Sequence, residues 1–234
     1  MRTIETRKNI EAKKSFMLFM ILLLVIAFVL VTSVTGFSQQ QQTSDESALT
    51  PKIGIKGGVN ISNLYTDNVK DENSKVGFNA GLFAKIPIVT GVSIQPELLY
   101  TTKGAQLTYN NILQGSGKYR FNLNYVETPL LMVFNITKNL NINGGAYAAY
   151  LTSVNIKDVD NNGDVNGVRD LNAENFNRFD WGLVGGIGFD IENVTIGARY
   201  NYGLREIGKS GSLSGDLTQN SKNSALSLFI GIGF

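Results

Sequence analysis

The last stretch of the chain, 224–234, alternates between apolar and small or polar residues and ends on the aromatic residue Phe234. Successive residues of a β-strand point to opposite faces, so this pattern predicts a strand with one apolar face. That face carries Leu226, Leu228, Ile230, Ile232 and Phe234. An apolar stripe ending in a C-terminal aromatic is typical of the closing strand of a membrane barrel, and the last strand of a soluble sheet is the alternative.

The same period of two recurs from Lys52 onward and indicates a series of strands. The candidate strands are 52–61, 76–86, 92–101, 120–134, 140–148, 179–190, 194–205 and 224–234. In the fourth, the apolar phase set by Phe121, Leu123 and Tyr125 shifts near Val126 and continues with Leu130, Met132 and Phe134. This shift predicts a β-bulge.

Charged residues lie in the middle of the polar faces of these strands, whereas a soluble barrel would bury apolar side chains in its interior. An apolar face turned outward into lipid and a polar face turned inward resolve the conflict, and this is the pattern of a transmembrane barrel. The interior of an eight-stranded barrel is just wide enough for its own side chains. We therefore expect an interior polar network whose members pair with one another: Lys56, Lys85, Glu97, Glu127, Asp180 and Arg199.

The predicted connections alternate in length. Those at 87–91, 135–139 and 191–193 are short, and those at 66–74, 102–118, 157–178 and 206–222 are long and polar. Short turns face the periplasm in such barrels. We expect an all-β fold, an eight-stranded antiparallel transmembrane β-barrel with both termini in the periplasm, whose closure removes the unpaired strand edges that hydrocarbon excludes.

The N-terminus has the features of an export signal. Basic residues precede a continuous apolar run, 16–31, and small residues occupy positions 36 and 38 ahead of a polar tract. This arrangement predicts a signal peptide over 1–38, a flexible periplasmic leader over 39–50 and the outer-membrane β-barrel over 51–234. An uncleaved membrane anchor is the alternative, because the apolar stretch approaches the length of a spanning helix.

Five segments of the barrel region carry a family resemblance. They read IGIKGGVN at 53–60, VSIQPELLYTTKG at 92–104, YVETPLL at 125–131, WGLVGGIGF at 181–189 and ARYNYGL at 198–204. Together they resemble the PorT-like outer-membrane β-barrel domain family, described mainly from Bacteroidota, over roughly residues 51–234. Thr128 departs from the Ile or Val usual at its position. The resemblance implies an eight-stranded outer-membrane barrel and, through the best-known members, a link to protein secretion.

Composition excludes several functions. The chain of 234 residues contains no His and no Cys, and its net charge is +2. Absence of His removes the commonest general base, and absence of Cys removes disulfides and the usual structural zinc sites. A nearly neutral chain does not indicate nucleic-acid binding. We expect no catalysis and no cofactor.

One loop imitates part of a calcium-binding loop. Asp158, Asp160, Asn162 and Asp164 place oxygen ligands at alternate positions around Gly163, but Arg169 occupies the position of the bidentate Glu. A solvated acidic turn is the alternative to a weak surface calcium site. Glu127, next to the predicted bulge, is expected to be a buried partner of Arg199 or Lys85. The aromatics Tyr100, Tyr125, Trp181, Tyr200 and Tyr202 are candidates for interfacial girdles.

These observations predict an outer-membrane β-barrel with a structural role or a role in surface interaction and adhesion. An accessory role in protein secretion is the first alternative, and a small-solute pore or an outer-membrane enzyme are further ones. The expected partners are outer-membrane lipid, the barrel-assembly machinery, for which Phe234 would be the C-terminal signal, and possible secretion components.

Overall fold

The computed structural model describes residues 50–65, 73–111, 115–160, 165–171, 173, 176–208 and 221–234. The predicted signal peptide and nearly all of the predicted leader lie outside these residues. Among the described residues, no helix is long and apolar enough to cross a membrane.

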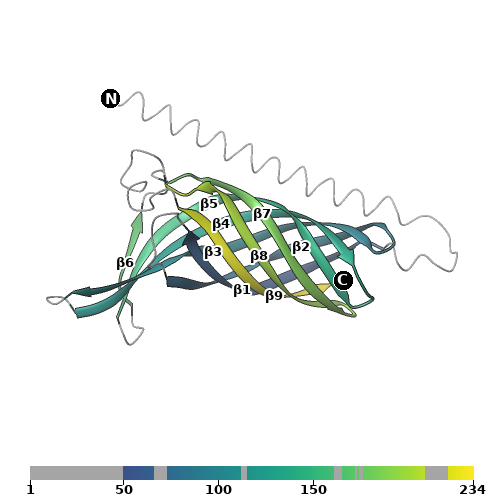
Figure 1. Cartoon of the computed structure of the whole chain (residues 1–234), viewed down its shortest axis with the longest axis horizontal. Helices are drawn as coiled ribbons and strands as arrows, with labels where there is room; N and C mark the ends of the chain where they lie inside the picture. The colour runs from purple at the N-terminus through teal and green to yellow at the C-terminus, as the bar shows by residue number, and fades with distance from the viewer. Residues whose placement is uncertain are drawn as a thin grey trace, which may run out of the picture. The chain divides into compact units, whose positions relative to one another are not determined.

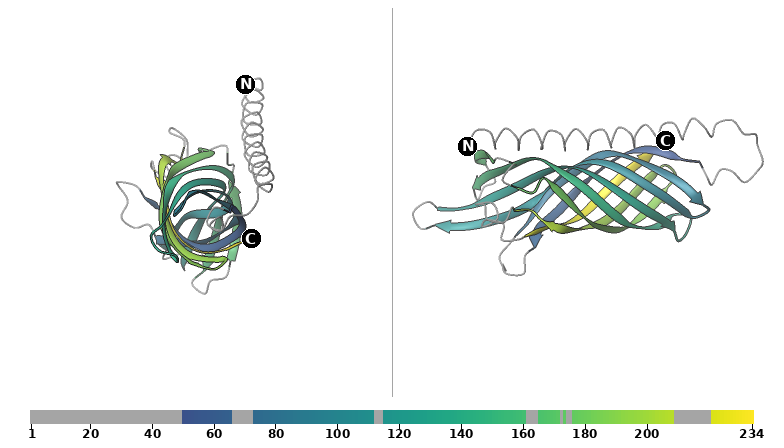
Figure 2. Two further views of the ribbon diagram at one scale, coloured as in Figure 1. Left: turned by 90° about the vertical axis from the view of Figure 1, so that its right-hand side faces the viewer. Right: turned by 90° about the horizontal axis from the view of Figure 1, so that it is seen from above.

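The described residues form one nine-stranded antiparallel sheet (Figure 1). Its strands are β1 (Lys52–Tyr65), β2 (Asn73–Val89), β3 (Val92–Asn111), β4 (Gly115–Asn135), β5 (Leu140–Asp160), β6 (Val165–Leu171), β7 (Phe179–Ile191), β8 (Val194–Glu206) and β9 (Lys222–Gly233). Every strand except β6 belongs to a closed ring, which is seen end-on in Figure 2. The predicted eight-stranded antiparallel barrel is confirmed.

The ring closes where the first and last strands meet. β9 pairs with β1 from Gly54↔Gly233 to Tyr65↔Lys222, so the C-terminal strand lies antiparallel to the N-terminal strand of the barrel. The pairing of β4 with β5 joins the two halves of the sheet on the other side. Each of the eight wall strands therefore has a hydrogen-bonded neighbour on both sides.

The apolar face of the wall points outward. In β9, Leu228 and Ile230 are 53% and 54% exposed, whereas Ala225 and Phe229 on the opposite face are buried. The same alternation gives an outward apolar belt on every wall strand, which includes Ile55, Val59, Phe78, Leu82, Leu98, Leu130, Ile142, Leu183, Ile187 and Ile196. A soluble sheet would bury this face, so the soluble alternative is excluded for these strands.

Three short turns join wall strands at one end of the barrel, which we call the short-turn rim. They are Thr90–Gly91 between β2 and β3, residues 136–139 between β4 and β5, and Glu192–Asn193 between β7 and β8. Gly91 has a φ of 82°, a backbone conformation that favours glycine. The C-terminus lies at the same rim, where Gly233 N donates to Asn193 O at 2.8 Å. The opposite end is called the loop rim.

The predicted loop over 102–118 is wrong, because most of it is strand. β3 continues to Asn111, β4 begins at Gly115, and the two pair along their full length to Asn111↔Gly115. The predicted loop over 157–178 likewise contains β6. These segments do not alternate between apolar and polar residues, because neither of their faces has to contact lipid. The hydrogen bonds between their backbones stabilise them as strands without an apolar face.

The extended strands form a sheet that continues past the barrel wall at the loop rim (Figures 1 and 2). β3, β4 and β5 contain 20, 21 and 21 residues, whereas β7 and β8 contain 13 each. β5 pairs with β7 only as far as Tyr150↔Phe179, and beyond this point it pairs with β6. We call residues 107–111, 115–124, 151–160 and 165–171 the projecting sheet.

A register shift lies next to the place predicted in the fourth strand, between Asn124 and Tyr125, but the extra residue belongs to the neighbouring strand. The shift of register lies on β5, where Asn124↔Ser153 is followed by Tyr125↔Leu151 and Thr152 is the extra residue. β4 itself keeps its phase, and Leu123, Tyr125, Glu127, Leu131 and Val133 all point inward. Tyr125 is completely buried, which contradicts a role in an interfacial girdle.

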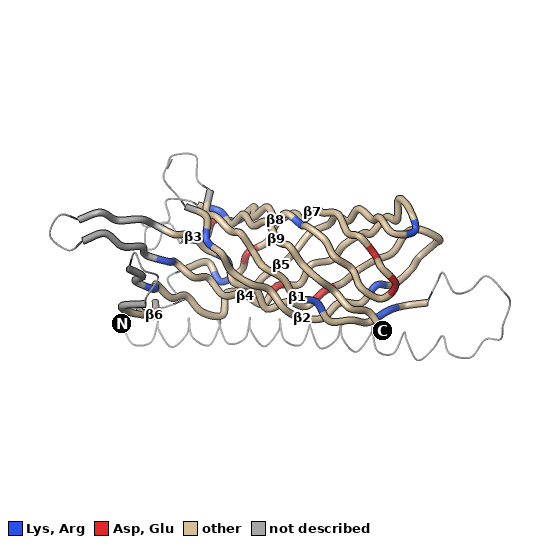
Figure 3. Tube along the Cα trace, turned by 90° about the horizontal axis from the view of Figure 1, so that it is seen from below, with Lys and Arg blue, Asp and Glu red and all other residues tan. Residues whose placement is uncertain are grey.

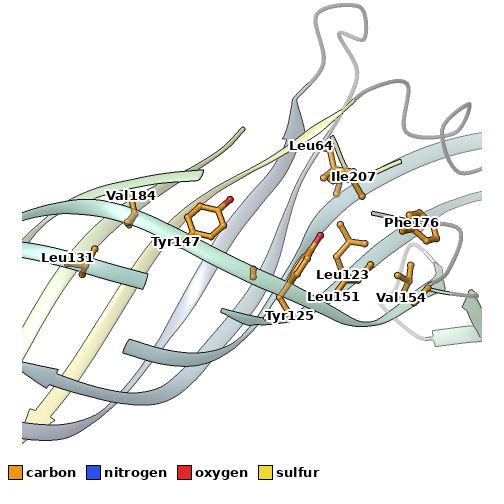
Figure 4. Close-up of a cluster of buried hydrophobic side chains, with 13 residues drawn as sticks. Leu64, Leu123, Tyr125, Leu131, Tyr147, Leu151, Val154, Phe176, Val184 and Ile207 are labelled. Carbon is orange, nitrogen blue, oxygen red and sulfur yellow. The ribbon is translucent and has the colours of Figure 1, made fainter. Parts of the chain in front are cut away.

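The sequence pattern predicts the wrong face for Leu123 and Tyr125 because part of the barrel interior is apolar. Buried aliphatic and aromatic side chains from several strands meet in the loop-rim part of the barrel and at the base of the projecting sheet, as Figure 4 shows. They include Leu64, Leu123, Tyr125, Tyr147, Leu151, Val154, Phe176 and Ile207. A strand whose inner and outer faces are both apolar carries no clean alternation, so its phase cannot be read from hydrophobicity.

The outward belt gives the first prediction. Leu228→Arg would place a charge on the lipid-facing side of β9 and should lower the free energy of unfolding by about 2–4 kcal/mol. Urea titration of the barrel in phospholipid vesicles measures the change. The matched control is Val168→Arg on β6, where Val168 is 59% exposed outside the ring, and it should stay within about 0.5 kcal/mol of wild type. Equal losses for the two variants would contradict a lipid-facing Leu228.

Candidate functional site: the charged interior of the barrel

A buried carboxylate bridges two cations across the middle of the barrel. Glu97 on β3 accepts from Lys56 Nζ on β1 at 3.2 Å and from Arg199 Nη1 on β8 at 2.7 Å. The side chains of all three are at most 4% exposed. Gln95 Nε2 donates to Glu97 Oε1 at 2.7 Å, and Asn143 Oδ1 accepts from Arg199 Nε at 3.3 Å. The carboxylate thus joins β1, β3 and β8, and Arg199 extends the network to β5.

An inward phenyl ring supports these cations. Lys56 Nζ lies 3.7 Å from the centroid of the Phe229 ring, and the Arg199 guanidinium carbon lies 5.0 Å from it. The ring can occupy this place because Gly197 of β8 has no side chain, and a Cβ there would come within 2.5 Å of Phe229 Cζ. The cations face the π-electrons of a buried ring as well as a carboxylate, which stabilises their charge away from water.

A second ion pair lies nearer the loop rim. Lys103 Nζ on β3 donates to Glu127 Oε2 on β4 at 2.5 Å, and Asn201 Nδ2 on β8 donates to Glu127 Oε1 at 2.8 Å. Lys103 Nζ also lies 4.3 Å from the centroid of the Tyr147 ring. The prediction that Glu127 pairs with Arg199 or Lys85 is therefore wrong. Arg199 pairs with Glu97, and Lys85 pairs with Asp190.

The last two predicted interior residues have separate environments. Asp180 Oδ2 accepts from Asn223 Nδ2 at 2.8 Å and from the Tyr147 hydroxyl at 3.4 Å. Lys85 pairs with Asp190 at 3.2 Å near the short-turn rim, with both side chains 21% exposed. The structure therefore joins Lys56, Glu97 and Arg199 directly and gives Lys85, Glu127 and Asp180 partners that were not predicted. Figure 3 shows acidic and basic positions distributed along the barrel.

Packed side chains leave little free space in the interior. One cavity of about 20 Å³ lies beside Lys56, Phe83 and Arg199, and one of about 10 Å³ lies beside Lys103 and Glu127. A single water needs roughly 10–15 Å³ of such space. Each of these two cavities is therefore about the size of a single water.

The interior partners that the sequence analysis did not name are polar residues on the inward face of their strands. Asp190, Asn143 and Asn201 lie on the polar faces of predicted strands. Lys103 continues the inward series Ser93, Gln95, Glu97 and Thr101 of β3, and extending that register would have placed it inside. Side-chain contacts between strands that are distant in sequence, such as β3 and β8, cannot be predicted from the pattern of a single sequence.

The structure places the other predicted site residues as follows. Asn162 and Asp164 lie outside the described residues, and Asp158 and Asp160 belong to β5 without described side chains. Among the described side chains, no group of three or more His, Cys, Asp or Glu residues could hold a metal ion. Phe234 is 77% exposed, and its backbone N–H donates to Ile53 O at 2.8 Å. Tyr100, Trp181, Tyr200 and Tyr202 point outward from the wall.

A closed antiparallel barrel with an outward apolar belt and a packed, charged interior defines a transmembrane β-barrel of the outer membrane. Residues 37–208 match the family described as outer membrane protein beta-barrel domain. The chain belongs to this family, and its location is the outer membrane.

Three solved structures are similar at low identity. Ail, the attachment invasion locus protein of Yersinia pestis, in complex with the heparin analogue sucrose octasulfate, is 16% identical over 79% of this chain and 99% of its own, with a TM-score of 0.45. Neisserial surface protein A is 13% identical over 78% and 97%, with a TM-score of 0.45. OprG from Pseudomonas aeruginosa is 16% identical over 82% and 99%, with a TM-score of 0.39. No curated protein matches the chain.

The carboxylate between two cations gives the second prediction. Glu97→Gln would leave Lys56 and Arg199 facing one another without a counter-charge, and breaking such a buried pair should cost roughly 3–5 kcal/mol of unfolding free energy. Adding Lys56→Met should recover part of that loss, because it removes one uncompensated cation. Lys138→Met in an exposed turn is the matched control and should stay within about 0.5 kcal/mol of wild type. A double variant less stable than Glu97→Gln alone would contradict the arrangement.

Proposed function

We propose that this chain is a non-catalytic surface-interaction protein of the outer membrane, which uses a rigid barrel to carry the projecting sheet. The observation that supports the proposal is the sheet itself. It extends past the wall at the loop rim and ends in β6, which pairs with β5 alone among the described strands. Val168 of β6 is 59% exposed. An unpaired strand edge is a common docking element, because it offers backbone groups to an incoming strand.

The proposed orientation puts the projecting sheet outside the cell. Barrels of this class turn their short connections toward the periplasm, and here the short-turn rim also carries the C-terminus. Both barrel termini would then be periplasmic after cleavage of a signal peptide over 1–38. Phe234, exposed at this rim, is proposed as the signal read by the barrel-assembly machinery.

The filled interior favours a surface role over transport or catalysis. A pore needs a continuous wet path, and the cavities of about 20 and 10 Å³ are too small for a solute. Each interior carboxylate of the two central ion pairs is engaged by cations and amides, as for Glu97 and Glu127. Side chains used in this way stabilise the barrel and are not available for acid–base chemistry.

An accessory role in protein secretion is the alternative, and it rests on the motifs that resemble the PorT-like family. A calcium ion bound by Asp158, Asp160, Asn162 and Asp164 would fit either role, since Asp158 and Asp160 lie at the end of β5 that precedes β6. The two roles differ in which part of the molecule is needed. Surface interaction requires the projecting sheet, whereas secretion requires the barrel in the envelope.

Deletion and complementation test the proposal. Cells that lack the chain should attach less well to surfaces or to other cells and should export their proteins normally. The wild-type chain should restore attachment, and a variant without residues 165–171 should reach the outer membrane but fail to restore it. Heat-modifiable migration on gels would verify that the variant barrel is folded. Loss of exported proteins in the deletion cells, with attachment unchanged, would overturn the proposal in favour of secretion.

A further inference from the structure

An amphipathic hollow lies on the barrel wall at the loop rim, outside the packed interior. It has a volume of about 350 Å³ and is lined by Asn177, Trp181, Leu204, Arg205, Glu206 and Lys222. Trp181 and Leu204 form an apolar side, and Arg205 and Lys222 bring two cations. Glu206 brings one carboxylate, so the lining carries a net positive charge.

The local fold explains why the wall is hollowed here. β8 pairs with β9 regularly up to Tyr202↔Ser224, and the next pair is Glu206↔Lys222. More residues of β8 than of β9 lie between these pairs, so β8 bows away from its neighbour and re-aims its side chains. Asn177 Nδ2 holds the bowed segment by donating to Glu206 O at 2.9 Å and to Gly208 O at 3.0 Å.

The hollow lies beside the lipid-facing side of the wall, at the end of the apolar belt nearest the loop rim. Trp181 is 53% exposed and shares the outer face of β7 with Leu183 and Ile187. Lys222 lies on the same face of β9 as Leu226. Tryptophan concentrates where the apolar belt of a barrel meets the headgroups. Arg205 and Lys222 follow directly beyond this level, toward the loop rim.

Neither cation of the hollow, Arg205 or Lys222, is paired with a carboxylate of the described residues, although Glu206 lies opposite Lys222 in the register. Elsewhere in this barrel the buried cations Lys56, Lys103 and Arg199 are neutralised by carboxylates, whereas buried Lys75 donates to the backbone oxygen of Lys103. Unpaired cations above an apolar wall fit an anion that is attached to an acyl chain.

We propose that this hollow binds the phosphate of a membrane lipid, with Arg205 and Lys222 contacting the phosphate and Trp181 and Leu204 contacting the adjoining apolar part of the lipid. Arginine and lysine are the side chains that recognise phosphate oxygens. The apolar side of the hollow selects a lipid phosphate over a free one. The assignment does not depend on which leaflet meets the loop rim, and so it stands apart from the proposed surface interaction.

Trp181 is the single tryptophan of the chain, so its fluorescence reports on the hollow directly. The full-length barrel is refolded into phosphatidylcholine vesicles that contain a fixed fraction of either brominated phosphatidic acid or brominated phosphatidylcholine, whose bromines quench nearby tryptophan. Wild type should bind the anionic lipid about fivefold more strongly than the neutral one. This is the enrichment expected for one positive charge near a membrane surface, and the lining has one net positive charge. Arg205→Gln with Lys222→Gln should reduce the ratio to one or below, because Glu206 then leaves the lining with a negative charge.

Lys138→Gln is the matched control, because it removes an exposed cation at the short-turn rim, and it should keep the wild-type ratio. Equal quenching of the wild-type protein by the two lipids would overturn the proposal whether or not the double variant folds. Abolition of the preference by millimolar inorganic phosphate would also overturn it, since the site would then bind free phosphate. Attachment assays of the same cells stay informative about the proposed surface interaction in either case.

Discussion

The absence of water from the hydrocarbon layer is the constraint on which the rest of this structure depends. A backbone N–H or C=O that is unpaired there costs several kcal/mol, so a spanning sheet has to close on itself. The pairing of β9 with β1 from Gly54↔Gly233 to Tyr65↔Lys222 meets this requirement. Once the ring is closed, each wall strand has to present one face to lipid and the other to the interior, which turns the usual arrangement of a soluble barrel inside out.

In this arrangement the apolar side chains face lipid, and the charged side chains are the ones that are buried inside the barrel. The interior of an eight-stranded ring is filled by side chains, so a charge inside is stabilised by pairing with an opposite charge or by hydrogen bonds. Glu97 accepts from Lys56 and Arg199, and Glu127 accepts from Lys103 and Asn201. Isolated ions in a dry interior are costly, whereas paired and hydrogen-bonded ions are tolerated. Because the partners come from β1, β3, β4 and β8, their pairing also ties strands across the barrel.

Much of the wall was predictable from the sequence, because lipid imposes an apolar residue at every second position. The strands around Ile53–Ile61, Val194–Leu204 and Leu226–Phe234 follow this rule, and the structure places them as expected. The rule weakens where lipid no longer acts. The sequence predicts a polar loop over 102–118, but residues 102–111 and 115–118 pair as strands, and those from 107 onward belong to the projecting sheet. Leu123 and Tyr125 were assigned to the wrong face because the interior beside them is apolar too.

The interior pairs were predictable as a set but not as partners. Alternation identified Lys56, Glu97 and Arg199 as inward, and charge balance suggested that they pair. Which cation meets which carboxylate depends on the tilt and stagger of strands that are far apart in sequence. Glu127 shows the limit, since its partner Lys103 was placed in a loop. The hollow beside Trp181 arises from an irregular register between β8 and β9, which hydrophobic alternation does not report.

Site-directed spin labelling along β9 tests the central claim, that apolar side chains face lipid and charged ones are enclosed. The chain has no cysteine, so single cysteines can be introduced and labelled one at a time. In a phospholipid bilayer, labels at Leu226, Leu228 and Ile230 should collide readily with dissolved oxygen, and labels at Ala225 and Ser227 should be immobilised and protected from it. The opposite alternation, with Ala225 and Ser227 accessible and Leu228 protected, would contradict the account.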